Sequence, residues 1–125
     1  MSHFTTIKTQ IKDIPALRSA LTEMGLSISS NTEARGYMQN KIKGDFVIHL
    51  KGPYDIALQK QPNDSYALVA DWFMGHVEKE VGKECSKLLQ LYGVHKTMRE
   101  ARQRGFSVLR SKQHNGTIKL VVMGA

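Results

Sequence analysis

The residues best suited to chemistry are cations gathered in the last quarter of the chain. Residues 95–125 contain seven Lys and Arg and one acidic residue, a net charge of +6, whereas residues 1–94 contain 11 and 10, a net charge of +1. Lysine and arginine neutralise phosphates, and the arginine guanidinium also binds carboxylates. Two interpretations follow: a surface that binds nucleic acid or another anion, or a solvated charged face. The cations are Lys96, Arg99, Arg102, Arg104, Arg110, Lys112 and Lys119.

Three of these cations predict a basic side on a helix. Lys96, Arg99 and Arg102 recur at every third position, and residues with this spacing are neighbours on a helix surface. Phe106 is the only Phe, Tyr or Trp in the basic quarter, so stacking on single-stranded bases has little support. If nucleic acid binds here, we expect phosphate contacts to dominate and binding to weaken steeply with salt.

The end of the chain predicts a β-hairpin. Asn115-Gly116 is a strong two-residue turn signal between two segments rich in strand-forming residues. Pairing His114 with Thr117 sets a register that makes one face of the hairpin largely apolar. In this register the opposite face carries Arg110, Lys112 and Lys119.

The residue types used in catalysis are present, but their spacing forms no known motif. Cys85 is the single cysteine, and its nearest histidine, His76, is nine residues away in the sequence and about half a turn round a helix, so it points to the other side and a buried, inert thiol is favoured. The five histidines are scattered, and Asp55 and Asp71 are expected in turns or on solvated strand faces. We therefore expect no cofactor and no metal, and an enzyme of unknown type is the third functional hypothesis.

Trp72 and Phe73 stand where the strand-like region gives way to the helical region. Large aromatic residues at such a junction commonly close a hydrophobic core. They also anchor protein partners, because tryptophan is enriched among the residues that dominate binding energy. Core packing is favoured, and a partner anchor at Trp72 and Phe73 is the alternative.

The periodicity of the first quarter predicts a strand and then a helix. Residues 3–11 alternate in the manner of a strand. Asp13 is a good cap for a helix that continues to Met24, with Pro15 in its first turn and Gly25 at its end.

The remaining elements follow from two changes of period. Residues 26–71 alternate with a period of two between turn residues, which is typical of an antiparallel meander. The region 76–104 has a helical period, with an interruption or bend expected at Gly93. Together with the hairpin, these elements predict one α+β domain over residues 1–125. We expect a curved antiparallel sheet of about six to eight strands with two helical segments packed on one face.

The composition is that of a folded protein outside the membrane. Apolar residues form 41% of the chain and charged residues 23%, but no apolar run reaches membrane-spanning length and the start has no signal-peptide pattern. A single cysteine agrees with a reducing compartment. These features predict a cytoplasmic protein with no membrane contact.

Several distinctive stretches resemble the family called hypothetical chloroplast reading frame thirty-five. They are the opening MSHFTTIKTQIKD, the segments GPYDIAL and VADW, and the ending YGVHKTMREARQRGF followed by NGTIKLVV. The resemblance implies a lineage of cyanobacteria and algal plastids but no activity. One departure is the end of the chain, Met123-Gly124-Ala125, where the family has a charged and aromatic end. That divergence would suit a bacterial side-branch or a phage-carried copy.

With no catalytic motif, the sequence favours a small binding or adaptor module that acts through protein contacts. The competing hypothesis is nucleic-acid binding through the phosphate backbone by the basic helix and hairpin. An enzyme is the most distant of the three.

Overall fold

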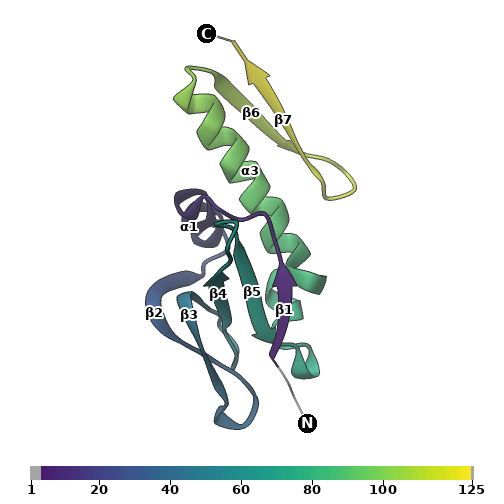
Figure 1. The fold of residues 1–125 in the computed structure, drawn as a ribbon. Coiled ribbons are helices and arrows are strands. Elements are labelled where there is room, and N and C mark those ends of the chain that lie inside the picture. Colours follow the sequence, from purple (N-terminus) through teal and green to yellow (C-terminus); the bar gives the residue numbers. More distant parts are fainter. Residues whose placement is uncertain (1–3, 125) are drawn as a thin grey trace.

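The computed structural model describes residues 4–124, and its long helix α3 leads out of a sheet into a separate β-hairpin (Figure 1). The predicted first strand begins at His3 and the predicted domain ends at Ala125, and both of these residues lie outside the described residues. The strands are β1 (Phe4–Lys8), β2 (Ser27–Arg35), β3 (Lys41–His49), β4 (Ile56–Lys60), β5 (Tyr66–Asp71), β6 (Ser107–Lys112) and β7 (Ile118–Met123). The α-helices are α1 (Ile14–Glu23), α2 (Glu78–Val81) and α3 (Ser86–Gln103).

Helix α1 begins and ends where the sequence predicts. Asp13 Oδ1 accepts a hydrogen bond from the N–H of Ala16 at 3.0 Å, and Pro15 occupies the first turn. Gly25 follows the helix with a φ of 74°, a conformation that glycine adopts without steric cost. The buried side of α1 consists of Ala16, Leu17, Ala20 and Leu21.

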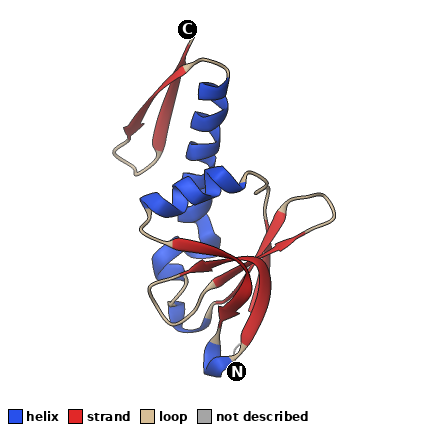
Figure 2. Ribbon diagram, turned by 90° about the vertical axis from the view of Figure 1, so that its left-hand side faces the viewer, coloured by secondary structure: helices blue, strands red, loops and turns tan. Residues whose placement is uncertain are grey.

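Strands β1 to β5 form one antiparallel sheet in the order β1-β5-β4-β3-β2. One face of this sheet, with Ile48, Ile56 and Leu68, shares a core with Leu17 of α1 and Leu88 of α3. The two long helices cross each other beside the sheet (Figure 2). Both predicted helical segments therefore pack on the same face, as expected.

The second face of the sheet is covered by the far end of the β2–β3 hairpin. Asn31 has a φ of 48° between the paired residues Ser30 and Thr32, and the hairpin bends in this region. At its end, a Cβ on Gly36 would lie 2.5 Å from Cζ of Phe4 in β1. The backbone at Gly36 can therefore lie against the ring only because glycine has no side chain. The bend encloses a small second core of Ala34, Val47, Ala57 and Val69.

Two aspartates expected on solvated surfaces are buried, which corrects that prediction. Asp55 is 1% exposed and binds the guanidinium of Arg35 at 2.8 Å through each carboxylate oxygen, and its Oδ2 also accepts the backbone N–H of Arg35. Asp71 accepts the backbone N–H groups of Tyr37 and Phe73. Each carboxylate joins segments that are distant in sequence, and strand alternation carries no signal for such bonds.

The region 76–104 is not one helix with a bend at Gly93. Helix α3 continues through Gly93, and the interruption lies earlier, where Gly82, Glu84 and Cys85 all have positive φ. Short 3-10 turns at Phe73–Gly75 and Lys83–Cys85 flank α2. Glycine suits position 82 because its φ is 87° and a Cβ there would be 2.8 Å from the backbone nitrogen of Lys87. No helix of the described part of the chain is long and apolar enough to cross a membrane.

Strands β6 and β7 form a separate two-stranded sheet, here called the ribbon (Ser107–Met123). The α+β prediction is confirmed: residues 4–124 form seven strands, which the structure divides between two sheets. The reason is the length of α3, whose 18 residues span about 27 Å and carry its C-terminal end beyond the first sheet. The ribbon turns back beside this end of the helix (Figures 1 and 2).

Candidate protein-binding surface

The ribbon has a different register from the predicted one. Leu109 pairs with Val121, Arg110 with Leu120 and Ser111 with Lys119, one residue out of step with the expected pairing. The turn is longer than two residues, because Gln113 and not His114 bonds to Thr117. Asn115 Oδ1 accepts the N–H and hydroxyl of Thr117, and this local bond replaces the expected tight turn.

The new register moves Lys119 to the face opposite that of Arg110 and Lys112. Cross-strand partners share a face, and successive residues of a strand alternate between faces. The inner face therefore carries Arg110 and Lys112 with Ile118, Leu120 and Val122, and the outer face carries Lys119. The prediction that Arg110, Lys112 and Lys119 share one face is wrong.

The inner face is tied to the body of the protein by a charged network. Arg110 donates to both carboxylate oxygens of Glu23 in α1, at 2.8 and 2.7 Å, and Nε2 of His95 in α3 lies 2.8 Å from Oε1 of the same carboxylate. The bonds from Arg110 lower the pKa of Glu23 to about 2, and those from His95 act in the same direction. Glu23 is thus a charged link between α1, α3 and β6.

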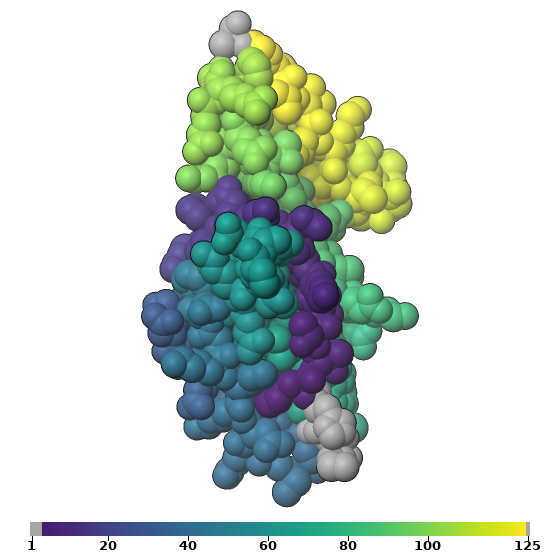
Figure 3. All heavy atoms as spheres, viewed as in Figure 1, coloured from purple at the N-terminus to yellow at the C-terminus, as the bar shows by residue number. Residues whose placement is uncertain are grey.

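The outer face of the ribbon carries three exposed apolar side chains, with Ser107, Ser111 and Lys119 beside them. Leu109, Val121 and Met123 are 58%, 41% and 39% exposed; Leu109 and Val121 are cross-strand partners, and Met123 is the next residue of β7 on this face. Phe106 and, on the inner face, Val122 are also exposed, so five of the seven exposed large hydrophobic residues among residues 4–124 belong to residues 106–123. The space-filling view shows this end of the chain standing out from the rest of the molecule (Figure 3). Exposed apolar groups gathered in this way are typical of a protein-interaction surface.

The seven predicted cations fall into two groups, according to whether a carboxylate lies within salt-bridge distance. Arg110 is held by Glu23, Arg99 Nε lies 3.5 Å from Asp13 Oδ2, and Lys96 Nζ lies 3.9 Å from Glu100 Oε1. The other four have no carboxylate within salt-bridge distance among residues 4–124; they are Arg102, Arg104, Lys112 and Lys119. The structure does not collect the seven on one continuous surface.

A groove between α1 and α3 collects two of the arginines. Its volume is about 400 Å³, and it is lined by Ser19, His95, Met98, Arg99, Arg102 and Gln103. Arg99 and Arg102 lie side by side there, as predicted from their spacing, but Lys96 does not line the groove. Asp13 and Glu23 bind Arg99 and His95, so two carboxylates also lie beside the groove.

Trp72 and Phe73 are only partly buried, and both pack against the main core. The ring of Phe73 lies 4.5 Å, centre to centre, from the ring of Tyr37. Trp72 also lines an open cavity with Ile7 and Glu78. These contacts favour the core interpretation over a partner anchor.

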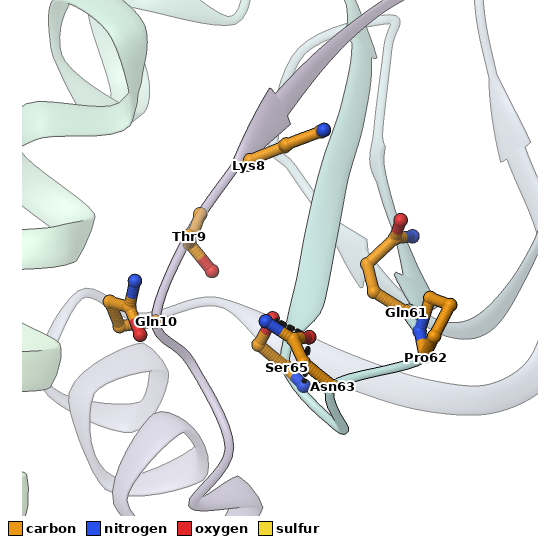
Figure 4. Close-up of a pocket in the computed structure, with 7 residues that line it drawn as sticks. All are labelled: Lys8, Thr9, Gln10, Gln61, Pro62, Asn63 and Ser65. Carbon is orange, nitrogen blue, oxygen red and sulfur yellow. Dashed lines mark hydrogen bonds between the residues drawn. The ribbon is translucent and has the colours of Figure 1, made fainter.

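A second polar cavity, of about 410 Å³, lies between the end of β1 and the β4–β5 turn (Figure 4). Asn63 Oδ1 accepts the N–H and hydroxyl of Ser65, and Thr9 donates to the carbonyl of Tyr66. Three of its polar side chains are therefore already engaged in holding the turn and the end of β1. The other lining residues are Lys8, Gln10, Gln61 and Pro62.

The thiol of Cys85 is fully buried, and burial raises its pKa to about 12. A thiol with this pKa stays protonated at neutral pH and is a poor nucleophile. Within residues 4–124, no three His, Cys, Asp or Glu side chains are arranged so that they could hold a metal ion.

Comparison with known proteins places the chain in a family. The family model described as "Protein of unknown function (DUF1257)" matches residues 20–121. "Uncharacterized protein ycf35" of Pyropia yezoensis is 32% identical over 98% of this chain and 96% of its own length, and the protein of the same name from Guillardia theta is 30% identical over the same shares. No solved structure matches the chain. The match over most of the chain and the two relatives agree with the family resemblance seen in the sequence, and the chain belongs to the DUF1257 family and is related to the ycf35 proteins.

Proposed function

We propose that this protein is a binding module that contacts another protein through the outer face of its C-terminal ribbon. The observation that carries the proposal is the cluster of Leu109, Val121 and Met123, which lies on a strand pair with nothing packed over that face among the described residues. Burying such side chains is favourable by about 25 cal/mol for each Å² removed from water.

The architecture of the ribbon supports the same function. An isolated two-stranded sheet is marginally stable in water, and a third strand or a packed face is needed to stabilise it. Here α3 and Glu23 support only the inner face. Packing on α3 meets this need on one face, and a partner on the outer face would bury the second.

Nucleic-acid binding has less support than protein binding. Three of the seven cations already lie beside carboxylates, and Lys119 is on the opposite face of the ribbon from Arg110 and Lys112. A phosphate backbone needs several free cations along one track. The pair Arg99 and Arg102 in the groove is too small a cluster for that purpose.

The proposal is tested by selecting binders from a display library of random peptides. We would compare the wild-type protein with the double variant Leu109→Ser and Val121→Ser, whose fold is checked by amide NMR spectra. The matched control is the double variant Met38→Ser and Met74→Ser, which removes exposed apolar side chains, 76% and 75% exposed, at two separate turns.

Peptides selected on the wild-type protein should lose at least about tenfold in affinity, ~1.4 kcal/mol, on the ribbon variant and keep it on the control. The proposal is overturned if the selected peptides bind the ribbon variant as well as the wild type, or if no peptide is enriched.

A further inference from the structure

One edge of the ribbon has unpaired backbone groups with a known spacing. Gln113 donates its N–H to the carbonyl of Thr117, so this pair is hydrogen-bonded, and in an antiparallel ladder bonded and non-bonded pairs alternate. The residues of β7 whose N–H and C=O point away from β6 are therefore Ile118, Leu120 and Val122. No hydrogen bond from another element of residues 4–124 reaches these groups.

The sequence of β7 does little to protect this edge. Edge strands are commonly guarded by proline, by several charges or by a covering segment, but β7 reads Ile-Lys-Leu-Val-Val-Met with one charge. The edge of β6 is different, because Arg110 and Lys112 lie on it and Arg110 is engaged with Glu23. Of the two edges, β7 offers the more apolar site for an added strand.

The charges around β7 indicate what such a strand would contain. Lys119 is on the outer face in the same row as Val121 and Met123, and it has no carboxylate partner among the described residues. The nearby Lys112 and the end of α3, with Arg102 and Arg104, are also unpaired cations in that part of the chain. Residues 95–125 together carry a net charge of +6.

We propose that an extended, acidic segment of a partner protein adds to β7 as the third strand of the ribbon. Its backbone pairs with Ile118, Leu120 and Val122, and on the outer face an Asp or Glu lies opposite Lys119, with apolar residues opposite Val121 and Met123. Main-chain bonds supply affinity in such strand addition, and the alternating side chains supply specificity. This inference rests on the proposed function and names the chemistry and geometry of its partner.

A second copy of the chain is the less suitable occupant. Pairing β7 with its own copy would bring two Lys119 side chains and two strongly basic C-terminal regions together without an acidic partner. Like charges across a sheet are destabilising. An acidic segment instead neutralises the excess charge.

The test uses a blocked synthetic peptide, here called the Val–Glu peptide, with Val, Val and Glu at positions i, i+2 and i+4 and Thr between them. One face of this strand can then place Glu opposite Lys119 and Val opposite Val121 and Met123. The matched probe, the Val–Lys peptide, has Lys in place of Glu. A third peptide carries the Val–Glu sequence with N-methyl groups on the alternate residues whose N–H groups would face β7, which removes the backbone donors of the added strand to β7. Affinity is measured for the wild-type protein, for Lys119→Glu and for Lys41→Glu, a control at an exposed lysine in the β2–β3 hairpin. Amide exchange at Leu120 and Val122 reports main-chain pairing.

We expect the Val–Glu peptide to bind the wild type at least about tenfold more tightly than the Val–Lys peptide. The preference should reverse in Lys119→Glu and persist in Lys41→Glu. Binding of the Val–Glu peptide should slow amide exchange at Leu120 and Val122. The N-methylated peptide should neither bind nor slow this exchange.

Several results would overturn the inference. Ribbon-dependent binding of library peptides that leaves the exchange of Leu120 and Val122 unchanged, or that prefers basic peptides, would contradict strand addition but leave the proposed function standing. Tight, salt-sensitive binding of oligothymidylate in place of the Val–Glu peptide would favour nucleic acid, and concentration-dependent dimerisation through β7 in light scattering would favour a second copy. Loss of all ribbon-dependent peptide binding would overturn the proposed function as well.

Discussion

Arg110 in β6 binds both carboxylate oxygens of Glu23 in α1, at 2.8 and 2.7 Å, although 87 residues separate them in sequence. This bidentate pair joins the ribbon to the main body, and His95 of α3 completes the network through Oε1 of Glu23. The orientation of the candidate binding surface therefore depends on one carboxylate that lies outside the ribbon itself.

Replacing Glu23 should loosen the ribbon more than it destabilises the fold. Because both side chains are about one-third exposed, we expect Glu23→Ala to cost about 1 kcal/mol or less in global unfolding free energy. Amide exchange in β6 and β7 should nevertheless become faster, while exchange in β4 and β5 stays unchanged. Glu100→Ala, which removes an exposed pair with Lys96, is the control and should leave the exchange of the ribbon as it is. Equal protection of the ribbon in both variants would contradict a linking role for Glu23.

The same network should make the ribbon sensitive to acid. The pKa of Glu23 falls from an ordinary 4.5 to about 2 in the folded protein, chiefly through its bonds with Arg110. A carboxyl group with a lowered pKa contributes stability that is fully present above its unfolded pKa and is lost as the pH falls through its folded pKa. We therefore expect the ribbon to stay ordered above pH 4.5 and to detach progressively down to about pH 2.

Carbon-detected NMR of the Glu23 carboxyl and amide exchange of the ribbon would follow this transition. In Glu23→Gln, the amide exchange of the ribbon should no longer change with the titration of residue 23 between pH 4.5 and about pH 2. A Glu23 titration with a midpoint near 4.5 would contradict the prediction.

Removing Arg35 should destabilise the whole domain, because it leaves the carboxylate of Asp55 buried without its counter-ion. Asp55 is 1% exposed, and Arg35 and burial have opposing effects on its pKa: burial raises it, whereas the bonds from Arg35 lower it to a net value below the ordinary one. We expect Arg35→Met to cost about 3 kcal/mol, at the lower end for a broken buried pair because the Arg35 side chain is half exposed.

Urea unfolding near neutral pH would measure this cost. Lys60→Met is the control, since it removes an exposed pair with Asp64 and should change stability by about 0.5 kcal/mol or less. The pKa of Asp55 should rise in Arg35→Met. A loss no larger than that of Lys60→Met would show that the pair is not needed to hold the bent hairpin.

Cys85 should react only when the protein opens. Its side chain is buried and its pKa is raised to about 12, so the native thiol is neither accessible nor ionised at neutral pH. We expect a coloured disulfide reagent to modify native Cys85 at least about a thousandfold more slowly than the urea-unfolded chain, in proportion to the small open population. Rapid, stoichiometric labelling of the native protein would contradict this and would restore a reactive-cysteine hypothesis.

Local sequence determined the elements whose signals lie within a few residues. The cap, first turn and end of α1 are set by Asp13, Pro15 and Gly25, because helix termini are satisfied by adjacent side chains and backbone. Alternation of apolar residues likewise predicted the meander of β2 to β5, and the distinctive segments predicted the family. The uneven distribution of charge was also visible without a structure.

Tertiary structure decided the features that depend on contacts between distant residues. The bonds from Arg35 to Asp55 and from Arg110 to Glu23 have no local signature, and they bury one carboxylate and remove one arginine from the predicted cation set. The ribbon register changed by one residue because Asn115 bonds to Thr117, and this moved Lys119 to the outer face beside Val121. A one-residue shift exchanges the two faces of a strand, so the composition of the candidate surface could be known only once the actual pairing was known.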